Sequence, residues 1–259
     1  MIPHEIMEKS SLMVNRFGDI KLAITVLSEI NKSTYEPVGG IKLLFTKVKV
    51  TTDNALSYKY AGHNVGSIKT LQHGLSISEA LYKIRSGKTK GTVLNEVSIA
   101  FPRYDDTHLY LYSDKKEEIS MKQMIAEFAI FANTFIGEYL KINFEGRGIF
   151  RICNAKEWLN TVYPEITGPE LLNEIIVNGI KAEYISTVKP HDLVGAPEYT
   201  HFTSPIRRLS DCVCHYLLKY IHLRRVNPTL PVPFSNDQLR KYSDDCLRMS
   251  KNTKNIQYR

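Results

Sequence analysis

The amino-acid sequence predicts an α+β fold, because strand-like segments come first along the chain and helix-like segments come later. Hydrophobic residues make up 43% of the 259 residues and charged residues 24%, which is ordinary for a globular domain. This composition excludes a disordered tail, a collagen-like chain and a disulfide scaffold. No segment approaches the roughly 18 consecutive apolar residues that a transmembrane helix needs, so we expect no membrane span.

Two strands are expected near the N-terminus. Residues 20–27 are rich in β-branched side chains and alternate loosely in polarity, which is the pattern of a strand. Residues 41–50 repeat that pattern, and Gly39–Gly40 before them is typical of a turn. The two segments therefore predict an antiparallel hairpin.

A second strand pair is expected after a short helix. Residues 76–86 place apolar side chains on one helical face. Residues 92–101 and 108–112 have the pattern of two strands joined by a turn at 102–107. The first part of the chain is therefore expected to be rich in strands.

The rest of the chain has the pattern of helices. The clearest helix runs from about residue 120 to residue 140, where apolar side chains recur every three or four positions. Further helices are expected from Gly168–Pro169, over 205–223 and from Ser235–Asp237, where Pro, Ser, Asn and Asp provide start signals. The long helix is apolar over a wide face, so we expect it to cross a sheet or to lie deep in a core.

The positive charge of the chain is concentrated toward its C-terminus. The formal net charge is +7. Residues 201–259 hold eleven Lys or Arg and four Asp, whereas the first 200 residues hold 23 basic and 23 acidic side chains. Such a basic excess attracts phosphate-rich partners. On the charge alone, a solvated basic face without a binding role is an equally good interpretation.

Four cysteines, Cys153, Cys212, Cys214 and Cys246, lack the spacing of a zinc site. Only Cys212 and Cys214 are close together, and no second pair follows them. On a helix, residues two positions apart point in different directions. We therefore expect reduced and mostly buried thiols, and no disulfide, because the chain shows no secretory signal.

A polar segment just before the expected 205–223 helix has the chemistry of a phosphate site. Thr203 or Ser204 is expected to cap the helix, with Pro205 in its first turn. A capped N-terminus offers free backbone N–H groups and a partial positive charge to an anion. Arg207 and Arg208 follow at once, and their fork-shaped donors match phosphate oxygens.

Aromatic side chains precede these arginines. Tyr199, His201 and Phe202 are suited to stacking on nucleic-acid bases. The alternative interpretation of the whole segment is structural: a capped helix whose arginines pair with acidic side chains. The residue types alone leave both interpretations open.

The segment Thr200–Arg208, Thr-His-Phe-Thr-Ser-Pro-Ile-Arg-Arg, followed by Asp211 and His215, resembles the signature of the ribonuclease II/R family, the RNB-domain exoribonucleases. The similarity extends to other segments of the chain. These segments are Pro3–Leu12, Met124–Phe128, Ala132–Asn133, Gly148–Arg151, Ala182–Tyr184, Ser186–Thr187 and His191.

The resemblance implies an RNB-like α+β domain, mainly antiparallel sheet packed against helices. It covers the C-terminal two-thirds of such a domain, so residues 1–259 are expected to form an N-terminally incomplete RNB-like domain. We divide it into a strand-rich part, residues 1–118, and a helix-rich part, residues 119–259, which carries the signature. The cold-shock and S1 domains of the family have no expected counterpart in this sequence.

The resemblance also implies an activity and a set of site residues. Members of the family degrade single-stranded RNA from its 3′ end and release nucleoside monophosphates, with Mg²⁺ held by a cluster of Asp residues. By position, Arg207 corresponds to the arginine that helps to hold the scissile phosphate and is the expected catalytic residue. The expected substrate-binding residues are Tyr199, His201, Thr203, Ser204, Arg208 and, as an aromatic clamp, Phe101.

The sequence departs from the family at the metal site. The family's Asp cluster lies upstream of the segment matched by Pro3–Leu12, so no Mg²⁺ ligand is assigned in this chain. The pairs Asp105–Asp106 and Asp244–Asp245 do not align with that cluster, and neither is expected to bind a metal. Lys251 stands in our alignment where the family has a catalytic Glu on the helix after the signature.

Three interpretations follow from these departures. The chain is one part of a split enzyme whose Asp cluster comes from a second polypeptide, or a catalytically inactive relative that retains RNA affinity or serves as a structural partner, or a truncated remnant. All three predict little or no exonuclease activity from this chain alone. A protein-interaction module whose basic residues serve solubility is the alternative from another class. Without a targeting segment, we expect a cytoplasmic location.

Overall fold

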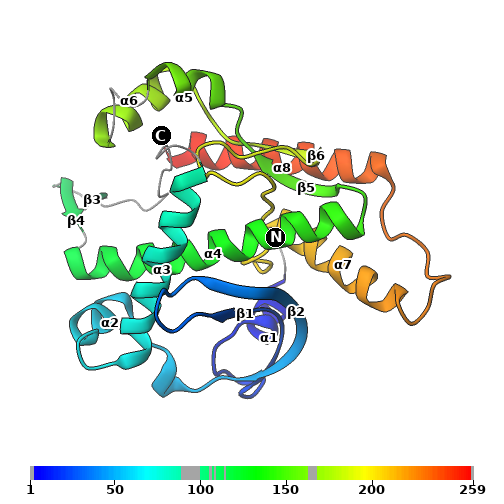
Figure 1. The fold of residues 1–259 in the computed structure, drawn as a ribbon, viewed down its shortest axis with the longest axis horizontal. Helices are drawn as coiled ribbons and strands as arrows, with labels where there is room; N and C mark the ends of the chain where they lie inside the picture. The colour runs from blue at the N-terminus through cyan, green and yellow to red at the C-terminus, as the bar shows by residue number, and fades with distance from the viewer. Residues whose placement is uncertain are drawn as a thin grey trace. The chain divides into compact units, whose positions relative to one another are not determined.

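The structure is a computed structural model that describes residues 3–88, 100–104, 107, 109–113, 115–162 and 168–257 (Figure 1). Its contacts divide the chain into two units. One unit consists of His4–Ile84 and Leu94–Phe131, and the other is formed mainly by Ala132–Arg259. The described residues form helices and three antiparallel strand pairs, which confirms the α+β class.

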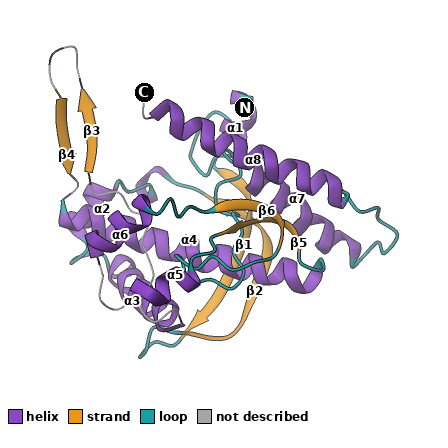
Figure 2. Cartoon of the chain, turned by 90° about the horizontal axis from the view of Figure 1, so that it is seen from above, coloured by secondary structure: helices purple, strands orange, loops and turns teal. Residues whose placement is uncertain are grey.

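The first unit contains a long hairpin of β1 (Ile20–Ile30) and β2 (Pro37–Lys49). The strands are antiparallel, with Ile20 opposite Lys49, and the register shifts after Leu27. The predicted hairpin is therefore confirmed. Figure 2 shows the two strands as a curved ribbon.

The turn of this hairpin does not lie at Gly39–Gly40, which is a correction to the prediction. The chain reverses over residues 31–36, and the Oδ1 atom of Asn31 accepts hydrogen bonds from the N–H groups of Ser33 at 2.8 Å and Thr34 at 3.1 Å. Asn favours turns because its side chain bonds to the backbone two residues on. Gly39 lies within β2 at φ +71°, a conformation that glycine adopts without steric cost.

Helices precede and follow this hairpin along the chain. They are α1 (His4–Ser10), a 3-10 turn (Thr52–Asn54), α2 (Tyr58–Asn64), α3 (Lys69–Lys88) and α4 (Lys116–Asn143). The helix expected over 76–86 lies within the longer α3. The helix expected over 120–140 is confirmed as α4. The N-terminal part of α4 packs against α2: a Cβ atom on Gly62 would lie 2.9 Å from the Glu117 backbone, so only glycine fits this approach.

Residues 100–113 contain a short strand pair. Strand β3 (Ala100–Tyr104) is antiparallel to β4 (Leu109–Ser113), with Phe101 opposite Tyr112. The predicted strand pair is thus confirmed for these residues. Residues 92–99 of the expected strand, the Asp105–Asp106 pair and the side chain of Phe101 lie outside the described part of the structure.

The second unit is built on a two-stranded ribbon covered by helices. Strand β5 (Arg147–Ile152) is antiparallel to β6 (Glu183–Thr187). Helix α8 (Asn236–Gln257) packs against both strands, and α7 (Leu209–Arg224) packs against β5 and α8. Figures 1 and 2 show α8 running along the ribbon. Two shorter helices, α5 (Lys156–Val162) and α6 (Gly168–Val177), lie between the strands in sequence.

The core of the second unit is apolar and closed. Its fully buried side chains include Ile136, Leu140, Ile149, Phe150, Leu217, Leu218 and Leu239. Burial of such a side chain contributes about 1.5–3 kcal/mol. These residues come from α4, β5, α7 and α8, so the core joins those four elements into one body.

The start of α8 confirms the predicted signal at Ser235. The Ser235 Oγ accepts the N–H of Gln238 at 3.2 Å, and the Gln238 Oε1 accepts the N–H of Ser235 at 2.8 Å. This reciprocal pair is a capping box, which satisfies two backbone donors at the helix start.

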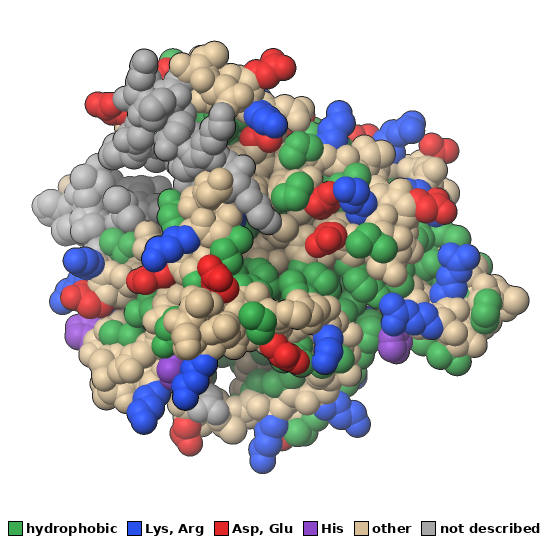
Figure 3. Space-filling view, in the orientation of Figure 1, with side chains coloured by type: hydrophobic (Ala, Val, Ile, Leu, Met, Phe, Trp, Pro, Cys, Tyr) green, Lys and Arg blue, Asp and Glu red, His purple; other side chains and the backbone are tan. Residues whose placement is uncertain are grey.

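Charge is mixed on the face shown in Figure 3, where Lys and Arg lie between Asp and Glu.

Candidate nucleic-acid interface

The signature segment begins as an extended stretch beside β5. The N–H of Arg151 donates to the carbonyl of Tyr199 at 2.9 Å, and the Thr200 hydroxyl donates to the carbonyl of Ile149 at 2.7 Å. Thr200 is fully buried. The first residues of the signature are therefore hydrogen-bonded to β5 and extend the β5–β6 pair by a short third segment.

Asn133 on α4 holds the same stretch from the other side. Its Nδ2 donates to the Tyr199 hydroxyl at 3.1 Å, and its Oδ1 accepts the N–H of Phe202 at 2.9 Å. One turn further along α4, Gly137 allows a close approach, because a Cβ there would lie 2.8 Å from the Glu198 carbonyl carbon. The helix thus positions the start of the signature through one buried amide and one glycine.

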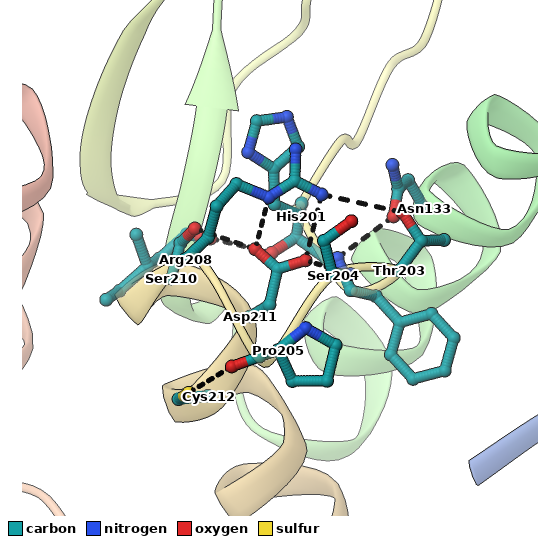
Figure 4. A network of polar contacts seen from close by, with 12 residues as sticks. Asn133, His201, Thr203, Ser204, Pro205, Arg208, Ser210, Asp211 and Cys212 are labelled. Carbon is teal, nitrogen blue, oxygen red and sulfur yellow. Dashed lines mark hydrogen bonds and ion pairs between the residues drawn. The ribbon is translucent and has the colours of Figure 1, made fainter. Parts of the chain in front are cut away.

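Asp211 organises the second half of the signature (Figure 4). Its carboxylate is fully buried and accepts hydrogen bonds from the Ser204 N–H at 2.7 Å and the Ser210 hydroxyl at 3.0 Å. The Arg208 guanidinium adds a bidentate contact, with Nε at 2.9 Å and Nη2 at 3.0 Å. Charge-assisted bonds of this kind are about twice as strong as neutral ones. Residues 204–208 are consequently closed into a turn against the start of α7.

The predicted cap of this helix is wrong. Helix α7 begins at Leu209, and Arg208 occupies the N-cap position without a side-chain hydrogen bond to the helix backbone. Thr203 and Ser204 do not cap the helix, and Pro205 lies in the turn before it. The cause is Asp211, because its buried carboxylate takes the Ser204 N–H and the Arg208 guanidinium and so extends the loop by several residues.

The two neighbouring arginines have different surroundings. The Arg208 side chain is 24% exposed, pairs with Asp211 and reaches the Thr203 hydroxyl at 3.5 Å. Arg207 is exposed, and within the described ranges its side chain has no hydrogen bond or ion pair with another residue. The loop therefore presents one unneutralised guanidinium, that of Arg207, to solvent.

The aromatic residues of the signature are buried. Tyr199 is 6% and His201 9% exposed, and the His201 Nδ1 lies 2.8 Å from the Tyr184 hydroxyl. The rings of Tyr199 and His201 meet edge to face with centroids 5.8 Å apart. Burial lowers the pKa of His201 to about 2, and the nearby charges of Arg208 and Arg151 lower it further in the same direction. His201 is therefore a neutral imidazole that packs against the rings of Tyr184 and Tyr199.

A second buried histidine, His191, also packs against Tyr199. The His191 ring lies edge to face on Tyr199 with centroids 5.4 Å apart. Burial lowers the pKa of His191 to about 4, with Arg151 contributing in the same direction. Neither ring nitrogen of His191 has a hydrogen-bond partner among the described residues.

Several of these contributions were not predicted from the sequence. Asn133 and Asp211 were recognised only as parts of the family resemblance, and no role was assigned to Tyr184. An available signal was the Arg208–Asp211 spacing of three residues, which favours an ion pair at a helix start. No comparable signal exists for Asn133, because its partners lie 66 and 69 positions away in sequence.

The described residues contain no set of side chains suited to binding Mg²⁺. They contain no group of three or more His, Cys, Asp or Glu side chains arranged to hold a metal ion. On α8, Asp244 is exposed and the Asp245 carboxylate accepts a hydrogen bond from Arg248 at 2.6 Å. Lys251 is exposed on the same helix. No catalytic step through a metal is therefore derived for this chain.

The four cysteines are free thiols. Cys153, Cys214 and Cys246 are buried, and Cys212 is half-buried with its Sγ donating to the Pro205 carbonyl at 2.7 Å. Burial raises the pKa of Cys153 and of Cys246 to about 11. The prediction of mostly buried thiols is therefore confirmed. Among the described residues, no helix combines the length and the hydropathy that crossing a membrane requires.

Two similar proteins are named as an exonuclease and an exoribonuclease. The chain is 24% identical to the exosome complex exonuclease RRP44 of Mus musculus, over 96% of this chain and 29% of that protein. It is 29% identical to the mitochondrial exoribonuclease II of Saccharomyces cerevisiae, over 49% of this chain and 14% of that protein. The chain thus spans less than a third of the length of these two relatives.

Solved structures share the fold. RNase R of Mycoplasma genitalium, in complex with ribose-methylated single-stranded RNA, has a TM-score of 0.71 at 17% identity, over 96% of this chain and 44% of that one. Yeast Ssd1, described as a pseudonuclease, has a TM-score of 0.67 at 15% identity, over 94% of this chain and 33% of that one. The family model of the RNB domain matches residues 1–223, and this chain therefore belongs to the RNB family, as its signature predicted.

Proposed function

We propose that this chain binds the 3′ end of single-stranded RNA and that Arg207 holds a phosphate of that strand. The observation that carries the proposal is the contrast within the signature turn: Asp211 neutralises Arg208, whereas Arg207 is exposed without a partner among the described residues. A guanidinium presents donors in a fork that matches a phosphate group. The complex of the similar RNase R with single-stranded RNA supports the choice of ligand.

The other expected contacts divide into exposed and buried residues. Thr203 is exposed directly before the turn of residues 204–208, and we propose that its hydroxyl contacts the RNA backbone. Ser204 and Arg208 are engaged with Asp211, and we assign them to holding the turn. Tyr199 and His201 are buried, so their proposed role is to support the binding surface from behind. An aromatic clamp by Phe101 stays a prediction.

We further propose that this chain does not hydrolyse RNA alone. Hydrolysis from the 3′ end with release of nucleoside monophosphates, as expected for the family, requires a metal such as Mg²⁺ to activate water and to stabilise negative charge. The described residues offer no ligand cluster for that metal. A second polypeptide that supplies acidic ligands would complete the site. A cytoplasmic location likewise stays a prediction.

A catalytically inactive RNA-binding protein is the second candidate. Two observations favour it: Lys251 stands where the resemblance places a catalytic Glu, and the pseudonuclease Ssd1 shares the fold. A Lys side chain cannot act as a carboxylate base. Under this candidate, addition of a second polypeptide would not produce hydrolysis.

Binding and hydrolysis are tested separately on the 259-residue chain. Binding is measured by fluorescence anisotropy with a labelled, ribose-methylated oligoribonucleotide, and hydrolysis with unmodified single-stranded RNA and Mg²⁺. We expect salt-sensitive binding that weakens about tenfold or more in Arg207→Ala, because a hydrogen bond to a charged group is lost. Arg240→Ala is the matched control, since Arg240 is exposed on α8.

Two results would contradict the proposal. Equal binding by the wild type and Arg207→Ala would remove Arg207 from the interface. Trimming of the 3′ end by the purified chain, lost in Arg207→Ala, would contradict the expectation that the chain is inactive alone.

A further inference from the structure

A second arginine lies close to the signature and has no carboxylate partner among the residues that the structure describes. Arg151 is on β5, directly opposite Tyr184 on β6. Its guanidinium lies over the Tyr184 ring, 4.7 Å from the centroid. The Arg151 side chain is half-buried, and in the described parts of the chain it forms no ion pair and no side-chain hydrogen bond.

The contact with Tyr184 holds this guanidinium over the ring. The group carries five N–H donors, and none of them meets an acceptor side chain among the described residues. The Tyr184 hydroxyl is engaged with His201 at 2.8 Å, so the ring itself is held in place. Arg151 is thus a cation held on Tyr184 whose donors have no side-chain acceptor in the described part of the chain.

The surroundings of His201 are positively charged. The charges of Arg151, Arg207 and Arg208 all act on the His201 ring and lower its pKa. Asp211 neutralises Arg208. Among the described residues, Arg151 and Arg207 therefore have no carboxylate partner, and both act on the same buried imidazole.

We propose that Arg151 binds a second phosphate of the RNA strand, next to the phosphate held by Arg207. The inference rests on the proposed RNA-binding function and adds a residue from β5 to the contact made by the signature turn. The alternative is that Arg151 only packs on Tyr184. Packing alone requires the aliphatic stem and the flat group, whereas phosphate binding requires the charge.

The test replaces single phosphates in the ligand and single charges in the protein. A ribose-methylated oligoribonucleotide carries one neutral methylphosphonate linkage, placed in turn at each position from the 3′ end. We expect the wild type to lose about tenfold in affinity at each of two neighbouring positions. Arg207→Met should become insensitive to the replacement at one of these positions, and Arg151→Met at the other.

The salt dependence gives a second readout. Each phosphate contact on a single strand contributes about 0.7 to the slope of log K against log salt concentration. We expect Arg151→Met to reduce the slope by about that amount, while Arg151→Lys retains most of it. Arg240→Met is the matched control and should leave both the slope and the methylphosphonate profile unchanged.

The outcomes separate this inference from the proposed function. If Arg207→Met changes the profile and Arg151→Met leaves both profile and slope unchanged, the role of Arg151 is refuted and RNA binding by Arg207 stands. If neither variant changes the profile, both fail. If Arg151→Met and Arg151→Lys both lower the melting temperature and both keep the salt slope of the wild type, Arg151 serves packing and not phosphate binding.

Discussion

The antiparallel strand pairs β1–β2 and β5–β6 have opposite surroundings. The β5 strand is almost wholly buried under α7 and α8, with Phe150 at 0% exposure. The longer β1–β2 hairpin leaves apolar side chains in solvent, with Leu22 at 79% and Ile20 at 53% exposure. An isolated two-stranded hairpin is marginally stable in water, so its stability comes from what covers it.

The comparison also explains where the candidate site lies. The signature segment is attached to β5, the covered strand, through Arg151 and Thr200. A side chain that must hold a phosphate needs a rigid support, and a strand buried on both sides supplies one. The same physics makes the β1–β2 hairpin an inappropriate support, because its exposed apolar residues add little to its own stability.

The largest expected effect comes from truncating one apolar residue in each of the strand pairs β1–β2 and β5–β6. Phe150→Ala should lower the free energy of unfolding by about 3–5 kcal/mol, because it leaves a cavity in a closed core. Leu22→Ala should change it by no more than about 0.5 kcal/mol, because Leu22 is largely exposed. Urea unfolding followed by circular dichroism measures both. Equal losses at the two positions would contradict the assignment of the core to the β5–β6 side.

The next effect concerns the buried carboxylate of the signature. Asp211→Asn should cost about 3–5 kcal/mol, because it leaves the Arg208 guanidinium without its charge partner in a buried setting. The same variant should weaken RNA binding by loosening the turn that carries Arg207. Asp245→Asn on α8 is the matched control, since the Asp245–Arg248 pair is largely exposed and worth about 0–1 kcal/mol.

A melting temperature that is equal in Asp211→Asn and Asp245→Asn would break the assignment of Asp211 as the organiser of the turn. Reduced RNA binding without loss of stability would instead point to a direct role of Asp211 at the RNA. The two readouts are independent, so each outcome identifies which part of the argument fails.

The sequence predicted the elements of the fold well where the signal was local. The wide apolar stripe of α4 and the Ser235–Gln238 capping box are local patterns, and both are confirmed. The turn of the first hairpin was misplaced because two glycines outweighed Asn31, whose side-chain bonds form the actual turn. Turn chemistry of this kind depends on which of several competent residues the strand register selects.

The contacts within the signature segment could not be predicted from the sequence. Arg207 and Arg208 are adjacent and identical in type, and they lie four and three positions before Asp211, spacings that both permit an ion pair on a helix. Burial of Asp211 by the packing of α7 against β5 decides which arginine is neutralised. The contact of Arg151 with Tyr184 joins strands 33 positions apart in sequence, and such pairings are set by the fold as a whole.

The smallest expected effect is on the pH dependence of stability. Burial lowers the pKa of His191 to about 4, against an ordinary value of 6.5. Above pH 6.5 the side chain is neutral in both the folded and the unfolded chain, so its ionisation adds nothing there. Below pH 6.5 the unfolded chain takes up a proton that the folded chain does not bind. Stability is therefore lost as the pH falls from 6.5 toward 4, by about 1.4 kcal/mol per pH unit for this group.

His191→Phe isolates that contribution, because phenylalanine packs on Tyr199 as a ring and cannot take up a proton. Urea unfolding at a series of pH values between 6.5 and 4 should give a slope shallower by about 1.4 kcal/mol per pH unit than in the wild type. His201 contributes to the slope in the same direction, and its contribution should persist in the variant. His63→Phe on α2 is the control, since His63 is exposed. An unchanged slope in His191→Phe would mean that His191 takes up a proton in the folded chain. The packed rings of His191, Tyr199 and His201 would then be open to water.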